Sequence, residues 1–151
     1  MKFSAKEQYG LRAMAELARY YGQGPVSLAE VAQAEGLSLP YLEQIAADLR
    51  RAGLLESRRG AYGGYMLARP PAEISVADII IALEGSLVQV PCVAEGDGLD
   101  SAGCDREGVC VTRGVWLNVY QHLVELLDSL TLADLIGQKC AETDPGGSYG
   151  H

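Results

Sequence analysis

The sequence predicts a mainly α-helical protein with one small β-hairpin, and three observations support this fold class. Apolar residues recur every three or four positions in several segments, as they do on one face of a helix. Serines and glycines stand at the starts and ends of these segments, where N-caps and C-terminal turns are needed. Two short runs that favour β-strand flank a glycine-rich stretch. With 151 residues, of which 48% are hydrophobic and 21% charged, the chain has the composition of a globular protein.

Helices are expected first. The apolar spacing over residues 6–21 predicts an amphipathic helix that ends at Gly22. Ser27 and Glu30 predict a capping box at the start of a second helix, because each side chain can satisfy a free backbone N–H of the first turn. Gly36 ends this short helix.

A third helix and a hairpin complete the first part of the chain. The helix is expected from Leu39 to about Arg51, with Ser38 as its N-cap. The second and third helices form a helix-turn-helix pattern. Residues 54–58 and 65–68 then predict two strands, and the connection between them contains three glycines. A hairpin directly after the third helix indicates a winged helix-turn-helix DNA-binding head over residues 1–69.

The faces of the third helix predict the DNA contacts. Gln44 can pair with adenine and Glu43 can accept from cytosine, although a solvated carboxylate explains Glu43 equally well. Arg58 and Arg59, where the wing leaves the sheet, are placed to reach a minor groove; solvated strand ends are the alternative. The expected DNA-contacting residues are Ser38, Tyr41, Glu43, Gln44, Arg50, Arg51, Arg58, Arg59 and Tyr62.

Charge divides the chain into two parts. Residues 1–69 carry nine basic against seven acidic residues, a net charge of +2, whereas the whole chain has a net charge of −8. The first part can approach a phosphate backbone and the acidic second part would be repelled by one; an acidic surface that serves only solubility is the alternative. No apolar run is long enough to cross a membrane, and the N-terminus lacks the apolar core of a signal peptide. We therefore expect a cytoplasmic protein without membrane contact.

The second part of the chain predicts a connection and a long helix. Residues 70–89 are expected to hold a connecting helix that Ser75 caps and Gly85 ends. Residues 111–140 are expected to form a dimerisation helix and a C-terminal helix, followed by a disordered tail over 141–151. An ordinary core helix is the alternative to dimerisation. The apolar seam of the long helix consists of Trp116, Tyr120, Leu123, Leu127 and Leu130.

Three cysteines lie in a loop over residues 90–110 that has no apolar period. Cys92, Cys104 and Cys110 are separated by eleven and five residues, unlike the close pairs typical of structural zinc. A disulfide is disfavoured in the cytoplasm. Thiolates on a glycine-rich loop suit an iron–sulfur cluster, and redox-active thiols without a metal are the alternative.

Motifs spread over Gly24–Gly85 carry a resemblance. The wing sequence Arg59-Gly-Ala-Tyr-Gly-Gly-Tyr65 is the most specific of them, and the chain resembles the IscR/CymR-type family of winged-helix transcription regulators. The resemblance implies a homodimer that binds a pseudo-palindromic DNA operator. It also implies an iron–sulfur cluster, 2Fe–2S rather than 4Fe–4S, on Cys92, Cys104 and Cys110. Arg113 stands where cluster-binding relatives have a histidine, and Glu7 lies where some relatives supply the fourth ligand.

The sequence thus predicts a homodimeric DNA-binding regulator whose operator affinity is controlled by an iron–sulfur cluster. A regulator of the same fold without a cluster, gated by thiol oxidation or by a protein partner in sulfur metabolism, is the alternative. A small iron–sulfur electron carrier is a more distant one. An enzyme is not expected, because the chain has two histidines and no nucleophile–base pair is apparent.

Overall fold

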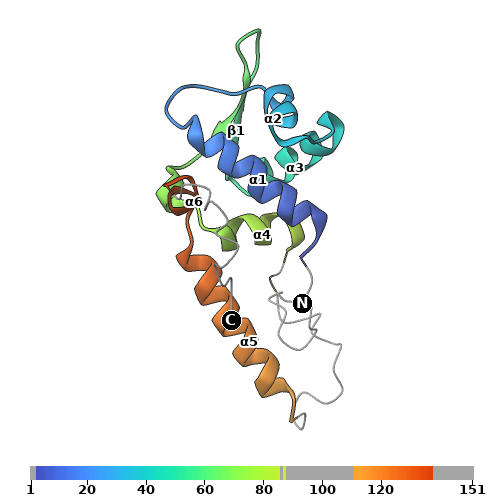
Figure 1. Cartoon of the computed structure of the whole chain (residues 1–151), viewed down its shortest axis with the longest axis vertical. Helices are drawn as coiled ribbons and strands as arrows, with labels where there is room; N and C mark the ends of the chain where they lie inside the picture. Colours follow the sequence, from blue (N-terminus) through green and yellow to red (C-terminus); the bar gives the residue numbers. More distant parts are fainter. Residues whose placement is uncertain (1–2, 86, 88–110, 138–151) are drawn as a thin grey trace, which may run out of the picture.

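A computed structural model describes residues 3–85, 87 and 111–137 of the chain (Figure 1). The described residues are mostly helical with one antiparallel hairpin, which confirms the predicted fold class. A single 3-10 turn, Pro71–Glu73, separates the hairpin from the fourth helix. The elements in chain order are α1 (Ala5–Arg19), α2 (Leu28–Glu35), α3 (Leu39–Arg51), β1 (Leu55–Arg58), β2 (Gly64–Leu67), α4 (Val76–Glu84), α5 (Arg113–Ser129) and α6 (Leu132–Gly137).

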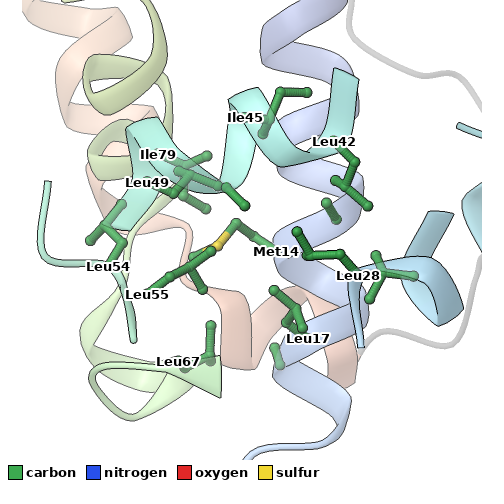
Figure 2. Packing of buried hydrophobic residues seen from close by; sticks show 14 of the residues in the cluster. Met14, Leu17, Leu28, Leu42, Ile45, Leu49, Leu54, Leu55, Leu67 and Ile79 are labelled. Carbon is green, nitrogen blue, oxygen red and sulfur yellow. The ribbon is translucent and has the colours of Figure 1, made fainter. Parts of the chain in front are cut away.

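One apolar core joins α1, α3, α4 and the base of the hairpin (Figure 2). Met14 of α1, Ile45 of α3 and Ile79 of α4 are completely buried in it. Leu55 and Leu67, which face each other across the hairpin, close the core from the strand side. The helix that was expected to be a connection therefore contributes to the core of the head, since burial of its apolar side chains stabilises both.

Helix starts follow the predicted positions but not always the predicted bonds. Ser27 is the N-cap of α2, but its hydroxyl accepts only from the N–H of Ala29, so the expected capping box with Glu30 is wrong. An N-cap oxygen can use either of two backbone donors, and here it uses the nearer one. Ser38 is the N-cap of α3 without a side-chain bond. Reciprocal capping boxes occur instead at α1 and α4.

The hairpin gains a third partner from outside its own sequence. The backbone N–H and C=O of Val26 pair with those of Tyr65, each at 2.8 Å, so the segment before α2 lies along β2. A Cβ atom on Gly64 would collide with the carbonyl oxygen of Val26. One on Gly63 would collide with the carbonyl oxygen of Arg58. These two glycines therefore allow the close backbone approaches that shape the wing.

Two backbone hydrogen bonds attach the segment between the last two helices to the head. Val76 N–H donates to Leu130 C=O at 2.8 Å, and Leu132 N–H donates to Ile74 C=O at 3.0 Å. Leu132 is completely buried, so α6 is held against the head core. From this attachment α5 extends away from the head (Figure 1).

Candidate nucleic-acid interface

The face of α3 that turns away from the core carries the predicted reading residues. Leu42, Ile45 and Leu49 are buried, whereas Glu43 and Gln44 are exposed on the other side of the same helix. This division follows from the 3.6-residue period, which separates positions 42, 45 and 49 from 43 and 44. Exposed side chains near the start of α3 are the ones that a major groove can reach when such a helix enters it.

Tyr41 differs from the other predicted contacts because it is half-buried. Its ring packs edge-to-face against Tyr9 of α1, with centroids 6.0 Å apart and planes at 88°. The guanidinium of Arg12 lies 5.8 Å from the centre of the Tyr9 ring. Packing therefore holds Tyr41 on the head, and only part of its surface can meet a ligand.

Two arginines lie at the C-terminal end of α3. Arg50 donates from Nη1 to Ser57 Oγ at 3.0 Å, which joins the end of α3 to strand β1 of the wing. Arg51 pairs with Asp48 one turn earlier on α3, and the same carboxylate accepts from Lys6 of α1. Both guanidiniums are thus held by neighbours, and both stay exposed.

The wing carries two further arginines and a tyrosine. Arg58 and Arg59 are exposed, and among the described residues no ion pair or hydrogen bond involves either guanidinium. Tyr62 is 95% exposed at the turn of the wing. Figure 1 shows α2, α3 and the hairpin together at the end of the molecule opposite to the free end of α5. The fold therefore brings the predicted contacts of α3 and of the wing to one region.

The predicted metal ligands lie in two places. Cys92, Cys104 and Cys110 fall outside the residues that the structure describes. Glu7 lies in the first turn of α1, where its Oε2 accepts from Ser4 N–H at 2.6 Å as part of a capping box. Within the described ranges, no group of three or more metal-binding side chains occurs.

The predicted dimerisation residues divide between two environments. Tyr120, Leu123, Leu127 and Leu130 pack partly against the α4 side of the same chain. Trp116 is 42% exposed near the free end of α5. Val115 and Leu126, the most exposed large apolar residues of α5, line a groove of about 530 Å³ together with Asn118, Val119, His122 and Leu123.

Some residues of this region were not predicted from the sequence. Lys6 and Asp48 carry no motif, and the 2.7 Å contact between them joins positions far apart in the chain. Val26 was not expected to pair with the hairpin either. No sequence pattern signals either contact, because both depend on how the helices pack.

A helix-turn-helix with a wing, exposed reading positions on α3 and free wing arginines define a winged-helix DNA-binding protein. A model of the Rrf2 family, described as an iron-dependent transcriptional regulator, matches residues 3–138. The chain belongs to the Rrf2 family. It is a DNA-binding transcription regulator and not an enzyme.

Individual relatives agree with this assignment. The HTH-type transcriptional regulator CymR of Bacillus subtilis strain 168 is 44% identical over 135 residues, which cover 89% of each chain. Its solved structure, described as the global cysteine regulator, has a TM-score of 0.72 and covers 91% of this chain and 97% of CymR. T. potens IscR has a TM-score of 0.72 and 44% identity, covering 99% and 94%. The oxidized form of Staphylococcus aureus CymR has a TM-score of 0.69 and 37% identity, covering 92% and 98%.

No helix among the described residues is long and apolar enough to span a membrane.

Proposed function

We propose that this regulator binds a pseudo-palindromic operator as a homodimer and that the state of an iron–sulfur cluster controls its affinity. The observation that carries the DNA-binding part is the position of the α3 reading face beside a wing with two free arginines. Gln44 and Glu43 read bases in the major groove, and Arg58 and Arg59 contact the backbone or the minor groove. The hydrogen bond from Arg50 to Ser57 Oγ holds the end of α3 against strand β1 of the wing.

In vitro selection of duplexes by the full-length chain tests this part. We expect a selected sequence with two inverted half-sites, since a two-fold symmetric dimer presents two equal reading helices. Gln44→Ala should relax the preference at one position of each half-site, and Arg59→Met should weaken binding to all sequences alike. Selection of no preferred sequence, or a Gln44→Ala variant with an unchanged preference, would contradict the proposal.

We assign dimerisation to the exposed apolar side of α5, where Val115 and Leu126 lie. Val115 and Leu126 are 58% and 57% exposed, although both are apolar, and they line the groove of about 530 Å³. Leu126→Asp should produce monomers in sedimentation velocity, because a charge cannot be buried there without a partner. Gln121→Asp places the same charge at an exposed position that does not line the groove, and this variant should remain dimeric.

The cluster part depends on the donor set. Three cysteines, Cys92, Cys104 and Cys110, would hold the cluster, since thiolates are the ligands that iron–sulfur centres prefer. Glu7 can contribute only its second carboxylate oxygen without giving up the bond from Ser4 N–H. When bound, such a cluster supplies a state that depends on iron and on redox conditions. The cluster can then control DNA binding only if the cluster state and the operator each favour one of two arrangements of the heads. They can favour the same arrangement or opposite ones.

Visible absorption with iron and sulfide analysis of protein purified without oxygen tests the cluster. We expect brown protein with iron and sulfide in equal amounts, two of each per chain for the 2Fe–2S form. A protein with Cys92, Cys104 and Cys110 all replaced by alanine should be colourless, and its operator affinity should no longer respond to oxidation. Colourless wild-type protein that also resists reconstitution would exclude the cluster and leave the DNA-binding part intact.

A regulator without a cluster, gated by thiol oxidation or by a protein partner, is the second candidate. It is favoured by the likeness to CymR, the global cysteine regulator of B. subtilis, and to S. aureus CymR in its oxidized form. This candidate predicts colourless protein whose operator affinity changes on treatment with a disulfide. Mass spectrometry should then find a mixed disulfide or sulfenic acid on a cysteine.

A further inference from the structure

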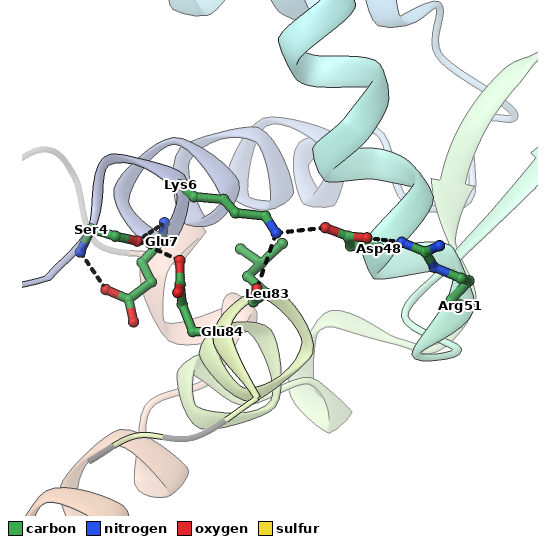
Figure 3. Close-up of polar contacts among 7 residues, drawn as sticks. All are labelled: Ser4, Lys6, Glu7, Asp48, Arg51, Leu83 and Glu84. Atoms are coloured by element: carbon green, nitrogen blue, oxygen red, sulfur yellow. Dashed lines mark hydrogen bonds and ion pairs between the residues drawn. The ribbon is translucent and has the colours of Figure 1, made fainter. Parts of the chain in front are cut away.

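The ammonium group of Lys6 joins three helices at the base of the DNA-binding head (Figure 3). Lys6 belongs to α1, and its Nζ lies 2.7 Å from Asp48 Oδ2 on α3. The same Nζ donates to the backbone carbonyl of Leu83 on α4 at 3.1 Å. That carbonyl belongs to the last turn of α4, where carbonyls lack a partner within the helix. The bond to Leu83 therefore fixes the ammonium in the position from which it reaches Asp48.

Asp48 is the centre of this arrangement because it serves two cations. Its Oδ2 accepts from Lys6, and its Oδ1 accepts from Arg51 Nη2 one turn further along α3. The Asp48 side chain is only 20% exposed, whereas that of Arg51 is 76% exposed. The guanidinium thus lies at the surface, with one side held by a partly shielded carboxylate.

We propose that Asp48 and Lys6 are positioning residues that set how readily Arg51 contacts a DNA phosphate. The inference rests on the proposed function and on the prediction from the sequence that Arg51 contacts DNA. A carboxylate shared by two cations holds each of them less strongly than it would hold one alone. Without Lys6, Asp48 would interact with Arg51 alone and would hold it more strongly. A DNA phosphate would then have to compete with this stronger ion pair for the Arg51 guanidinium.

A double-mutant cycle on operator affinity tests the inference, with the full-length chain and the duplex that in vitro selection returns. Lys6→Met should weaken binding about threefold and Asp48→Asn should tighten it about threefold, which is the size of one exposed ion pair. In the Asp48→Asn background, Lys6→Met should have no further effect. Lys6→Arg, which retains the positive charge, should bind the operator with wild-type affinity. The measurements belong at low salt, where such pairs are least screened.

Additivity is the result that would overturn the inference. If each substitution acted only through the general charge of the head, the effects of Lys6→Met and Asp48→Asn on binding would multiply. Arg19→Met provides the matched control, since Arg19 is a basic residue of α1 that pairs with Glu16 and not with Asp48. This variant should combine with Asp48→Asn additively. Thermal unfolding of each variant separates loss of folded protein from loss of affinity.

Failure of the proposed function gives a different pattern. If Arg51→Met leaves operator affinity unchanged, Arg51 is not a DNA contact and the proposed interface is wrong at this position. If Arg51→Met weakens binding and the cycle is additive, the interface stands and the role of Lys6 and Asp48 is refuted. The inference is supported if Arg51→Met weakens operator binding and if Lys6→Met does not change operator affinity in either the Asp48→Asn or the Arg51→Met background.

Discussion

Replacing Arg58 with methionine tests the wing through the salt dependence of operator binding. Among the described residues, the Arg58 guanidinium has no ion-pair partner, so its charge is available to a phosphate. Each phosphate contact contributes about 0.9 to the slope of log K against log salt. A dimer that loses one contact in each wing should lose about 1.8 from that slope. Between about 50 and 200 mM salt, the ratio of wild-type to variant affinity should therefore change about tenfold.

The assay is fluorescence anisotropy of the selected duplex at several salt concentrations. Arg19→Met is the matched control, because Arg19 is also exposed but is paired with Glu16 at 3.2 Å, and the substitution changes the net charge equally. We expect the slope of the control to stay near the wild-type value. If both variants lowered the slope by the same amount, the wing would contribute only to net charge and the assignment of Arg58 as a contact would be refuted.

Three further substitutions test the scaffold. Gly63→Ala places a Cβ against the Arg58 carbonyl oxygen, so the wing turn must open; operator affinity should fall while the helical circular dichroism is retained, and unchanged affinity would show that the turn tolerates the methyl group. Leu132→Ala should lower the free energy of unfolding by about 2–5 kcal/mol in urea titration, because the side chain is completely buried; a change below about 1 kcal/mol would argue against docking of α6. Ser75→Ala removes the N-cap bond of α4 and the bond to Asp128 and should cost about 1–2 kcal/mol by the same titration, unlike an exposed serine.

Local signals were enough to predict the elements of the head. The third helix was expected from Leu39 to about Arg51, and α3 has these bounds. Gly36 and Gly85 have positive φ at the ends of α2 and α4, as the sequence indicated. The first helix ends at Arg19, two residues before the predicted end. The prediction was too long because apolar residues continue the helical pattern into the turn before Gly22. Capping, periodicity and glycine placement depend on residues that are close in the sequence, so they can be predicted from the sequence alone.

Contacts between distant segments could not be read in the same way. Tyr41 was expected to face DNA, and its edge-to-face contact with Tyr9 depends on the crossing of α1 and α3. The pairing of Val26 with Tyr65 and that of Lys6 with Asp48 likewise require the packed core before they can form. One sequence contains the residues of such a pair but no period that links them. For this reason the exposed face of α3 was predictable, whereas the partners of its two terminal arginines were not.

The placement of α4 explains how events at α5 can reach the DNA-binding head. Ile79 and Leu83 of α4 belong to the head core, whereas Val76 and Ile80 of the same helix pack against α5. A shift of α5 would therefore act on a helix that cannot be displaced without disturbing the packing around α1 and α3, because closely packed interiors transmit strain. The last-turn carbonyl of Leu83 lies on this helix and holds the ammonium that pairs with α3. Core packing and the contacts of Lys6 thus join α4 to α3, the helix that we propose reads DNA.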